Sequence, residues 1–452
     1  MLRIYDTARQ EVVPLQLRDP DKVSMYVCGP TVYAPPHLGH GRMVLVFDVI
    51  RRYLTWRGFD VTFVSNVTDI DDKIIEKANA EGVSSEEVAA VAEDVWWEAM
   101  DRIDVLRPDH TPHATAYVDE MVDLIARLVD TDRAYVTSDG VYLGVEGVEG
   151  YGLLAHQSLD QLLEGGGDRT VVGTEKRHPA DFALWKFSKE GEPSWPSPWG
   201  DGRPGWHTEC VVMSLDLLGE GFDIHAGGMD LTFPHHENER AQALADGKGF
   251  STHWMHNGFV EMDGQKMSKS LGNVRNLVDL TDTYDPRAYR LLVLRSHYRS
   301  PIEITDVTMR DAEAALGRLD AFVRRTASLD GSADPAVVDT FRTTMDDDFD
   351  TSGAIDLVFR QVREANTALD DGDETRAATL AATVLEIAGA LGLRLEADAG
   401  DDVPAEITAL VAERTEAKAA KDWGRADAIR DELTAAGWVV EDSADGPKVR
   451  RV

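Results

Sequence analysis

Cysteine is scarce in this sequence, since only Cys28 and Cys210 occur among 452 residues. Two thiols cannot supply a set of several disulfides, so the class of small, disulfide-held secreted proteins is excluded. Uncharged apolar runs of 18 or more residues are also missing, and the first ten residues lack the basic and then apolar pattern of a secretion signal. These absences predict a soluble, cytoplasmic protein with no membrane partner.

Positive charge is the second shortage. Lysine and arginine number 46 against 81 aspartates and glutamates, which gives a formal net charge of −35 and a pI near 4.6. Non-specific attraction to a polyanion is therefore excluded, and any contact with RNA has to use local basic groups. We expect this acidity to reflect a salt-rich cytosol, where the Debye length falls to ~3 Å and self-repulsion is muted. A GC-rich genome, whose codons favour Asp, Arg and Ala, is the alternative explanation.

The N-terminal third reads as an α/β pattern. An apolar run at 25–29 ends at a Gly-Pro pair, residues 38–56 carry apolar side chains at helical spacing, and 60–67 reads as a second strand after Gly58. Strand, glycine loop, helix and strand form a βαβ unit, so we expect a parallel sheet with helices on its faces. Ligands of such sheets bind at the carboxyl ends of the strands.

The rest of the chain suggests further parts. We expect residues 1–304 to form the sheet domain, with helical sequence from about 84 to 130 and an insertion at about 115–204 that is rich in Gly, Pro and Trp. Residues 305–395 carry only helical spacing and predict a helical bundle. An acidic linker at 396–404 precedes a small C-terminal domain at 405–452, with helices at 407–420 and 423–435 and a final hairpin.

Two motifs carry candidate phosphate-binding residues. His37 and His40 flank Gly39 where the first predicted helix begins, and the free backbone N–H groups of a helix N-terminus suit an anion. Lys266 and Lys269 lie three apart in KMSKS, on a loop at 263–273 that we expect to be mobile. Two such lysines form a cationic clamp for the charge that develops on a triphosphate, whereas a solvated basic turn is the structural alternative.

This pairing of HxGH with a late KMSKS resembles the class I aminoacyl-tRNA synthetases. The resemblance implies a Rossmann-like catalytic domain that activates an amino acid with ATP and Mg²⁺ and then esterifies tRNA. It assigns catalysis to His37, His40, Lys266 and Lys269, and ATP binding to His37, Gly39, His40 and Lys269. A Walker-type phosphate loop is absent from the sequence.

A third group offers metal ligands. Cys28 ends the first strand, Cys210 lies in GWHTEC, and His235 and Glu239 are spaced i, i+4 in FPHHENERAQ. Two thiolates, one imidazole and one carboxylate are the ligand types that Zn²⁺ accepts. A zinc ion beside an amino-acid pocket can bind a cysteine substrate as its thiolate, while shape alone separates cysteine from serine by only roughly 1–3 kcal/mol.

The blocks MYVCGPTVYAPPHLGH, NVTDIDDKII, GWHTEC, FDIHAGGMDLTFPHHENE, KMSKSLGN and HYRS resemble the cysteinyl-tRNA synthetase family in its own order, over nearly the whole chain. The likeness implies one zinc ion held by Cys28, Cys210, His235 and Glu239. It also implies that Thr68 and Trp206 help to form the pocket for L-cysteine. The likeness further implies a monomer whose partners are ATP and tRNA(Cys). His225, His236 and His256 are expected to line the pocket or to be structural.

Two other functions compete with this interpretation. The cysteine ligase of mycothiol synthesis resembles the same family and would share the zinc site and both nucleotide motifs, but it joins cysteine to glucosaminyl-inositol. Its expected lack of an anticodon-side domain separates it from this chain, in which residues 421–451 resemble that domain. A non-catalytic RNA-binding relative would be expected to have lost a lysine, a histidine or a metal ligand, and all of them are present.

Overall fold

The computed structural model describes residues 1–159, 161, 175–262, 265–267, 274–397, 405–443 and 446–451. The chain forms two compact units, one of Met1–Gly317 with Leu329–Arg394 and one of Arg318–Ser328 with Leu395–Val452. None of the helices in the described ranges combines the length and the apolar composition needed to cross a bilayer.

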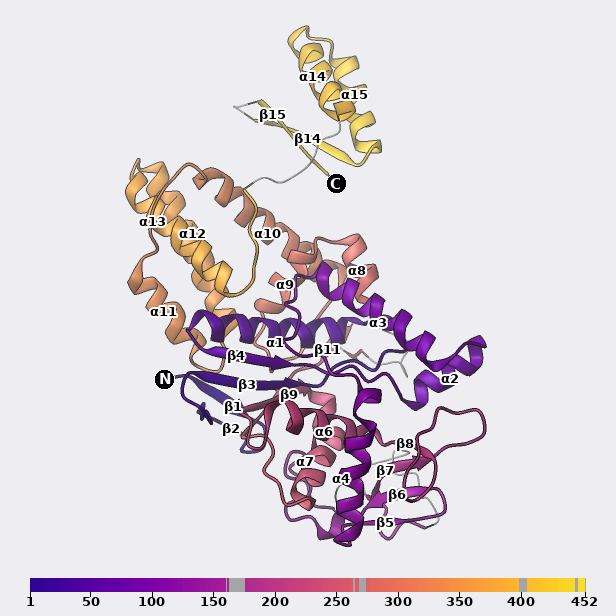
Figure 1. The fold of residues 1–452 in the computed structure, drawn as a ribbon. Coiled ribbons are helices and arrows are strands. Elements are labelled where there is room, and N and C mark those ends of the chain that lie inside the picture. The colour runs from indigo at the N-terminus through magenta and orange to yellow at the C-terminus, as the bar shows by residue number, and fades with distance from the viewer. Residues whose placement is uncertain are drawn as a thin grey trace. The chain divides into compact units, whose positions relative to one another are not determined.

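A parallel four-stranded sheet lies at the centre of the first unit, with the order β10-β9-β3-β4. The predicted strand, helix and strand unit is confirmed as β3 (Lys22–Val27), α1 (Leu38–Trp56) and β4 (Asp60–Val64). The other two strands are β9 (Ile224–Gly228) and β10 (His253–Asn257). Figure 1 shows α1 on one face of this sheet, with α6 (Trp206–Leu218) and α7 (Glu237–Ala245) on the other.

Local sequence signals fix the limits of α1. His37 is its N-cap, and Gly58 adopts a φ of 92° just beyond its C-terminal residue Trp56. A left-handed φ of this kind favours glycine and ends the helix. Apolar side chains such as Leu45, Phe47 and Ile50 are buried, so the helix is held by packing on the sheet.

The single helical stretch predicted at 84–130 was wrong. The structure has α3 (Ser85–Arg102) and α4 (Val118–Asp130), separated by an extended segment that runs beside β4. In that segment the Asp109 N–H donates to the carbonyl of Phe63 at 2.9 Å. The prolines at 108 and 112 explain the break, because proline lacks the N–H that a helix interior needs.

An antiparallel sheet of the order β5-β6-β7-β8 lies between α4 and α6 in the chain. Its strands are β5 (Ala134–Val136), β6 (Gly140–Leu143), β7 (Phe182–Phe187) and β8 (Gly202–Pro204). An ion pair ties this sheet to α2 (Asp72–Glu81), because Asp72 accepts from Lys186 at 2.6 Å and from Arg203.

Short strands and helices complete the first unit. They are β1 (Arg3–Asp6), β2 (Glu11–Pro14), β11 (Val260–Met262), β12 (Gln265–Lys266), α8 (Leu277–Thr283), α9 (Pro286–Leu294), β13 (Ile302–Glu303), the start of α10 (Asp306–Thr326), α11 (Pro335–Met345), α12 (Thr351–Asp370) and α13 (Glu374–Ala390). The predicted run of helices without strands after residue 305 is confirmed in the described part of the chain as far as residue 397.

A buried ion pair joins α1 to α9. Asp48 and Arg290 are each 2% exposed, and the Arg290 Nη1 donates to Asp48 Oδ2 at 2.7 Å. Arg52 donates to the same oxygen at 2.9 Å, and the Leu106 N–H donates to Oδ1 at 2.9 Å. Helix α1, whose N-cap is His37, is thus fixed to α9 by charge as well as by packing.

Besides the end of α10, the second unit contains two helices and a hairpin. These are α14 (Ala405–Ala419), α15 (Trp423–Ala435), β14 (Trp438–Ser443) and β15 (Gly446–Arg451). Ile429, Leu433 and Trp438 contribute to its apolar core. The two helices and the hairpin predicted for this region are confirmed, with helix ends that shift by at most two residues.

Candidate metal and nucleotide site

The two histidines of HxGH cap the helix that follows them. His37 N–H donates to His40 Nδ1 at 3.2 Å, and His40 N–H donates to His37 Nδ1 at 3.3 Å. The imidazole rings stack with centroids 3.6 Å apart, next to Trp96. This differs from the sequence expectation of free backbone N–H groups, because the first-turn amides of Leu38 and His40 are both bonded, the former to the carbonyl of Arg275.

The capping geometry also sets where each imidazole carries its hydrogen. Because both Nδ1 atoms accept, the hydrogen of each neutral ring lies on Nε2. Burial lowers the pKa of His37 and lowers the pKa of His40 to about 3. Both rings are therefore neutral near pH 7, and they offer Nε2–H donors to a phosphate rather than positive charge.

The strand that leads into the lysine loop lies against this turn. β11 and β12 pair with Glu261 opposite Lys266, and a Cβ on Gly39 would lie 3.5 Å from the Cε of Met267. Lys266 belongs to β12 by its backbone, while its side chain and all of Lys269 lie outside the described residues. Arg42, which is 1% exposed, donates to the carbonyls of Phe259 at 2.7 Å and of Ser300, so α1 holds the base of this strand in place.

The four predicted metal ligands are brought together at the carboxyl edge of the sheet. Their ligand atoms, one each from Cys28, Cys210, His235 and Glu239, all lie within 4.8 Å of one another, and all four residues are buried. The two Sγ atoms are 3.8 Å apart, Cys210 Sγ is 3.5 Å from His235 Nε2, and Cys28 Sγ is 3.5 Å from Glu239 Oε1. A tetrahedral zinc ion separates its ligand atoms by about 3.3–3.8 Å, so the set fits such an ion.

A second group shares two of these residues. Cys28 and Glu239 also lie within 4.8 Å of the ligand atoms of His225 and His236. His225 Nε2 is 2.7 Å from Glu239 Oε2, and His236 Nε2 is 3.3 Å from Cys28 Sγ. Residues that contact the metal-binding side chains without binding the metal commonly orient those side chains. His225 and His236 are placed to do this for Glu239 and Cys28.

The two pocket residues predicted from the resemblance lie beside this group. Trp206 stacks on His235 with ring centroids 3.9 Å apart. Thr68 is buried, and its hydroxyl donates to Glu209 Oε2 at 2.9 Å. The structure thus brings the predicted pocket residues and the predicted metal ligands into one site.

Comparison with known proteins decides the family. Residues 14–314 match the family described as tRNA synthetases class I (C) catalytic domain, residues 340–396 match the DALR domain, and residues 400–450 match the cysteinyl-tRNA ligase anticodon binding domain. The chain is 45% identical over 466 residues to the cysteine–tRNA ligase of Chromobacterium violaceum, with 100% of both chains covered. It is 42% identical to the enzyme of the same name from Syntrophotalea carbinolica, with 98% of both covered. The chain belongs to the cysteine–tRNA ligase family.

Solved structures show the same fold at low identity. The chain matches a methionyl-tRNA synthetase from Mycobacterium tuberculosis bound to methionyl-adenylate with a TM-score of 0.59 at 16% identity, over 82% of this chain and 90% of that one. It matches a leucyl-tRNA synthetase from Agrobacterium radiobacter with a TM-score of 0.61 at 11% identity, over 84% of both chains. The predicted class I fold, an α/β catalytic domain followed by helical domains, is therefore confirmed.

Burial and neighbouring charges set the protonation of the ligand set in this member of the cysteine–tRNA ligase family. Burial opposes the ionisation of Glu239, but His225 and His235 beside it lower its pKa well below the usual value. Burial also opposes the Cys210 thiolate, yet donation from Cys28 and the charge of His235 lower the Cys210 pKa to about 6. Burial, followed by the neighbouring Cys210 and Glu239, raises the pKa of Cys28 well above its usual value. Without a cation the site therefore favours one thiolate, that of Cys210, and the Glu239 carboxylate, and a bound metal ion would favour the second thiolate as well.

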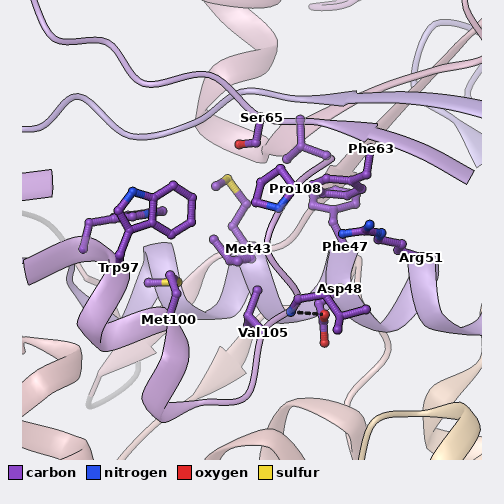
Figure 2. A pocket seen from close by; sticks show the side chains of 14 residues that line it. Met43, Phe47, Asp48, Arg51, Phe63, Ser65, Trp97, Met100, Val105 and Pro108 are labelled. Atoms are coloured by element: carbon purple, nitrogen blue, oxygen red, sulfur yellow. Dashed lines mark hydrogen bonds between the residues drawn. The ribbon is translucent and has the colours of Figure 1, made fainter. Parts of the chain in front are cut away.

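An apolar cavity lies elsewhere in the catalytic domain (Figure 2). It is small, with a volume of about 30 Å³ between α1, α3 and β4, and Met43, Phe47, Phe63 and Met100 are among the residues that line it. None of the predicted site residues lines it. Its small size and apolar walls do not suit ATP or an amino acid.

Sequence reasoning missed several neighbours of the site. His207 Nδ1 lies 2.9 Å from His235 Nδ1, and Asn66 Oδ1 accepts from the Gly29 N–H at 2.9 Å. Both His207 and Glu209 lie inside the GWHTEC block, and Asn66 lies two residues before Thr68. Their positions close in the sequence to predicted site residues could have marked them as neighbours of the site. Sequence position could not show which contacts they make.

Proposed function

We propose that this chain is a cysteine–tRNA ligase that binds one zinc ion through Cys28, Cys210, His235 and Glu239. The observation that carries the proposal is the gathering of these four buried ligand atoms, in a chain that covers the full length of a cysteine–tRNA ligase. Zinc bound there would supply a soft Lewis acid that binds the thiolate of a cysteine substrate. Serine has only a hydroxyl group and cannot offer a thiolate. Thr68 and Trp206 would close the cysteine pocket around it.

The proposed first step joins cysteine to AMP. A carboxylate oxygen of cysteine attacks the α-phosphorus of ATP, the bond to pyrophosphate breaks, and no general base is needed. His37 and His40 would hydrogen-bond the phosphates through Nε2, while Lys266 and Lys269 neutralise the charge that develops on pyrophosphate together with Mg²⁺. Since the two imidazoles are neutral, the lysines carry the cationic part of this role.

The proposed second step transfers cysteine to tRNA(Cys). A ribose hydroxyl of the terminal adenosine attacks the carbonyl carbon of the adenylate and the bond from that carbon to the bridging oxygen breaks. AMP leaves with this oxygen, and the hydroxyl proton passes to the departing phosphate or to water. We further propose that residues 1–304 are catalytic and that residues 305–395 and 405–452 bind tRNA on either side of the linker at 396–404. The matches to a DALR domain and to an anticodon binding domain support this division. The proposed enzyme acts as a monomer in the cytoplasm.

The competing acceptor is an amino sugar. The mycothiol-pathway ligase would form an amide with glucosaminyl-inositol from the same adenylate. The match of residues 400–450 to an anticodon binding domain favours tRNA. The test incubates the protein with cysteine and ATP and offers tRNA(Cys) or glucosaminyl-inositol, and amide formation without charging of tRNA would refute the proposal.

Two measurements test the site itself. Metal analysis of the purified protein is expected to find one zinc per chain, together with cysteine-dependent ATP–pyrophosphate exchange that exceeds exchange with serine by more than the ~10–200-fold that shape can give. Lys269→Ala is expected to lower the exchange rate with little change in cysteine binding. Exchange by this variant within twofold of wild type would remove the lysine from the proposed step.

A further inference from the structure

A polar cleft lies near the metal ligands but is separate from them. Its volume is about 420 Å³, which falls within the range of about 300–1,000 Å³ typical of small-molecule sites. Its walls come from β1 and the turn after it, from residues 154–157, from residues 229–233 after β9 and from the end of β10. Ligands of parallel sheets bind at the carboxyl ends of the strands, so the cleft lies at the functional edge of the sheet.

The cleft belongs to the face of the sheet that carries the metal ligands. His256 lines it, and His256 Nε2 lies 2.8 Å from His236 Nδ1, while His236 Nε2 lies 3.3 Å from Cys28 Sγ. Two imidazole rings therefore separate the cleft from a predicted metal ligand. The HxGH turn instead begins α1, which covers the opposite face from α6 and α7 (Figure 1). A ligand in the cleft thus approaches the amino-acid site from the side away from the HxGH turn.

Acidic side chains are absent from the described walls of the cleft. More than one residue in six of the chain is an aspartate or a glutamate, yet none of the described residues that line the cleft is either. Arg299 lies in the wall, where Nε and Nη2 donate to Asp348 Oδ2 at 2.7 and 2.6 Å and the guanidinium stacks 4.3 Å from the ring centre of Tyr5. These contacts fix the guanidinium in place and leave Nη1 without a partner among the described residues. A phosphate therefore meets less repulsion here than over most of this acidic protein.

The cleft also offers groups that recognise a nucleobase. The side-chain amides of Gln10 and Gln157 line it and form no hydrogen bond with any residue in the described ranges. A glutamine amide can both donate to and accept from the edge of a base. Phe233 and Met229 add apolar surface, and Met229 is 38% exposed. Free amides, an aromatic ring and an arginine are the groups by which proteins bind unpaired nucleotides.

We infer that this cleft binds an unpaired nucleotide of the acceptor end of tRNA, with its base against Phe233 and its phosphate near Arg299. The inference rests on the proposed function and deepens it by naming a nucleotide pocket apart from that for ATP. Transfer needs both pockets, because the attacking end of the tRNA and the departing AMP cannot occupy the same space. Entry from the α7 face brings the tRNA end to the cysteine without displacing the adenylate.

The test adds a negative charge to the cleft without changing its shape. Gln157 is exposed, and Gln157→Glu is expected to raise the KM for tRNA(Cys) in cysteine charging at least ~fivefold, because the new carboxylate repels the phosphate. Cysteine-dependent ATP–pyrophosphate exchange, which uses no tRNA, should stay within twofold of wild type. Gln16→Glu is the matched control, since Gln16 is also exposed but lies at the other end of β10, where its N–H donates to His253 Nε2 at 3.0 Å. Its KM for tRNA(Cys) should change by less than twofold.

A shortened RNA locates the contact. The Kd of intact tRNA(Cys), and of tRNA(Cys) without its unpaired 3′ nucleotides, is measured for wild type and for Gln157→Glu. We expect the variant to bind the intact tRNA more weakly than wild type does and to bind the shortened tRNA equally well. Equal weakening of both RNAs, or weakening of neither, would overturn the inference, and so would a loss of pyrophosphate exchange, which would assign the cleft to ATP. Wild-type protein that charges no tRNA(Cys) would instead refute the proposed function, so the two failures are distinguishable.

Discussion

Gly39→Ala tests whether the stacked histidines act as one unit. A Cβ at this position would lie 3.0 Å from His37 Cε1 and 3.1 Å from His37 Nδ1, closer than ordinary van der Waals contact. His37 cannot yield toward its neighbour, because its ring already stacks on His40 with centroids 3.6 Å apart. The imidazole must therefore rotate or shift by a few tenths of an ångström, which moves its Nε2 and loosens the reciprocal cap.

The expected effect is on catalysis rather than on stability. Alanine within a helix is favoured over glycine by about 1 kcal/mol, and a strained side-chain rotamer costs about 0.5–1.5 kcal/mol, so the two nearly cancel. A misplacement of 1 Å at a reacting group can cost about a hundredfold in rate, and a smaller shift is expected to cost about tenfold. The assay is cysteine-dependent ATP–pyrophosphate exchange, together with a thermal melt.

Gly389→Ala is the matched control. Gly389 lies in α13 with no heavy atom within 4 Å of a Cβ, so alanine there is expected to raise stability by up to about 1 kcal/mol and to leave exchange unchanged. If Gly39→Ala exchanges pyrophosphate within twofold of wild type, the stacked pair does not position the phosphates. If it melts far below wild type, the cancellation of the two energies is wrong.

The remaining predictions concern metal, charge and salt. Cys210→Ser is expected to lower the zinc content per chain and the melting temperature, and a full complement of zinc measured by mass spectrometry would contradict the ligand set. Asp48→Asn leaves buried arginine charge uncompensated and should lower the free energy of unfolding by about 3–5 kcal/mol in urea, whereas Asp101→Asn, in an exposed pair, should change it by less than about 1 kcal/mol. Although burial opposes it, pairing with two cations lowers the pKa of Asp72, so its stabilising effect is present above the unfolded value near 3.9 and is lost at lower pH. The stability gap between wild type and Asp72→Asn should thus be constant from pH 5 to 7 and close below about pH 4. Raising KCl from 0.1 to 2 M should raise the melting temperature, because screening mutes the net charge of −35, and an unchanged melting temperature would favour the codon explanation.

Much of the fold followed from local signals in the sequence. The limits of α1 at Leu38 and Trp56 were predicted because a glycine ends it and apolar residues recur at helical spacing. The break between α3 and α4 was missed because the prolines at 108 and 112 were given too little weight, although proline is disfavoured inside a helix. Pairing with β4, which the sequence does not show, also favours the extended form. The kinds of metal-binding side chain, and their expected position at the carboxyl edge of the sheet, predicted that four residues lie close together. These are Cys28, Cys210, His235 and Glu239.

Which residues belong to the site could be predicted from the sequence, but the contacts between them could not. The mutual capping of His37 and His40 depends on ring orientation, which residue spacing does not specify. The hydrogen bonds that link Gly29, Asn66, Thr68 and Glu209 join separate parts of the chain, and a sequence shows only that a glutamate lies beside a cysteine. Lys269 remains a prediction from its motif.

The placement of the ligand set also has a consequence for biosynthesis. Cys28 and Cys210 lie 182 residues apart in the chain, and Glu239 comes later still. While the ribosome is still making this stretch, the first thiol has none of its three later partners and can hold an ion only weakly. Capture of the proposed zinc ion by all four ligands can therefore begin only once the chain has been made as far as Glu239.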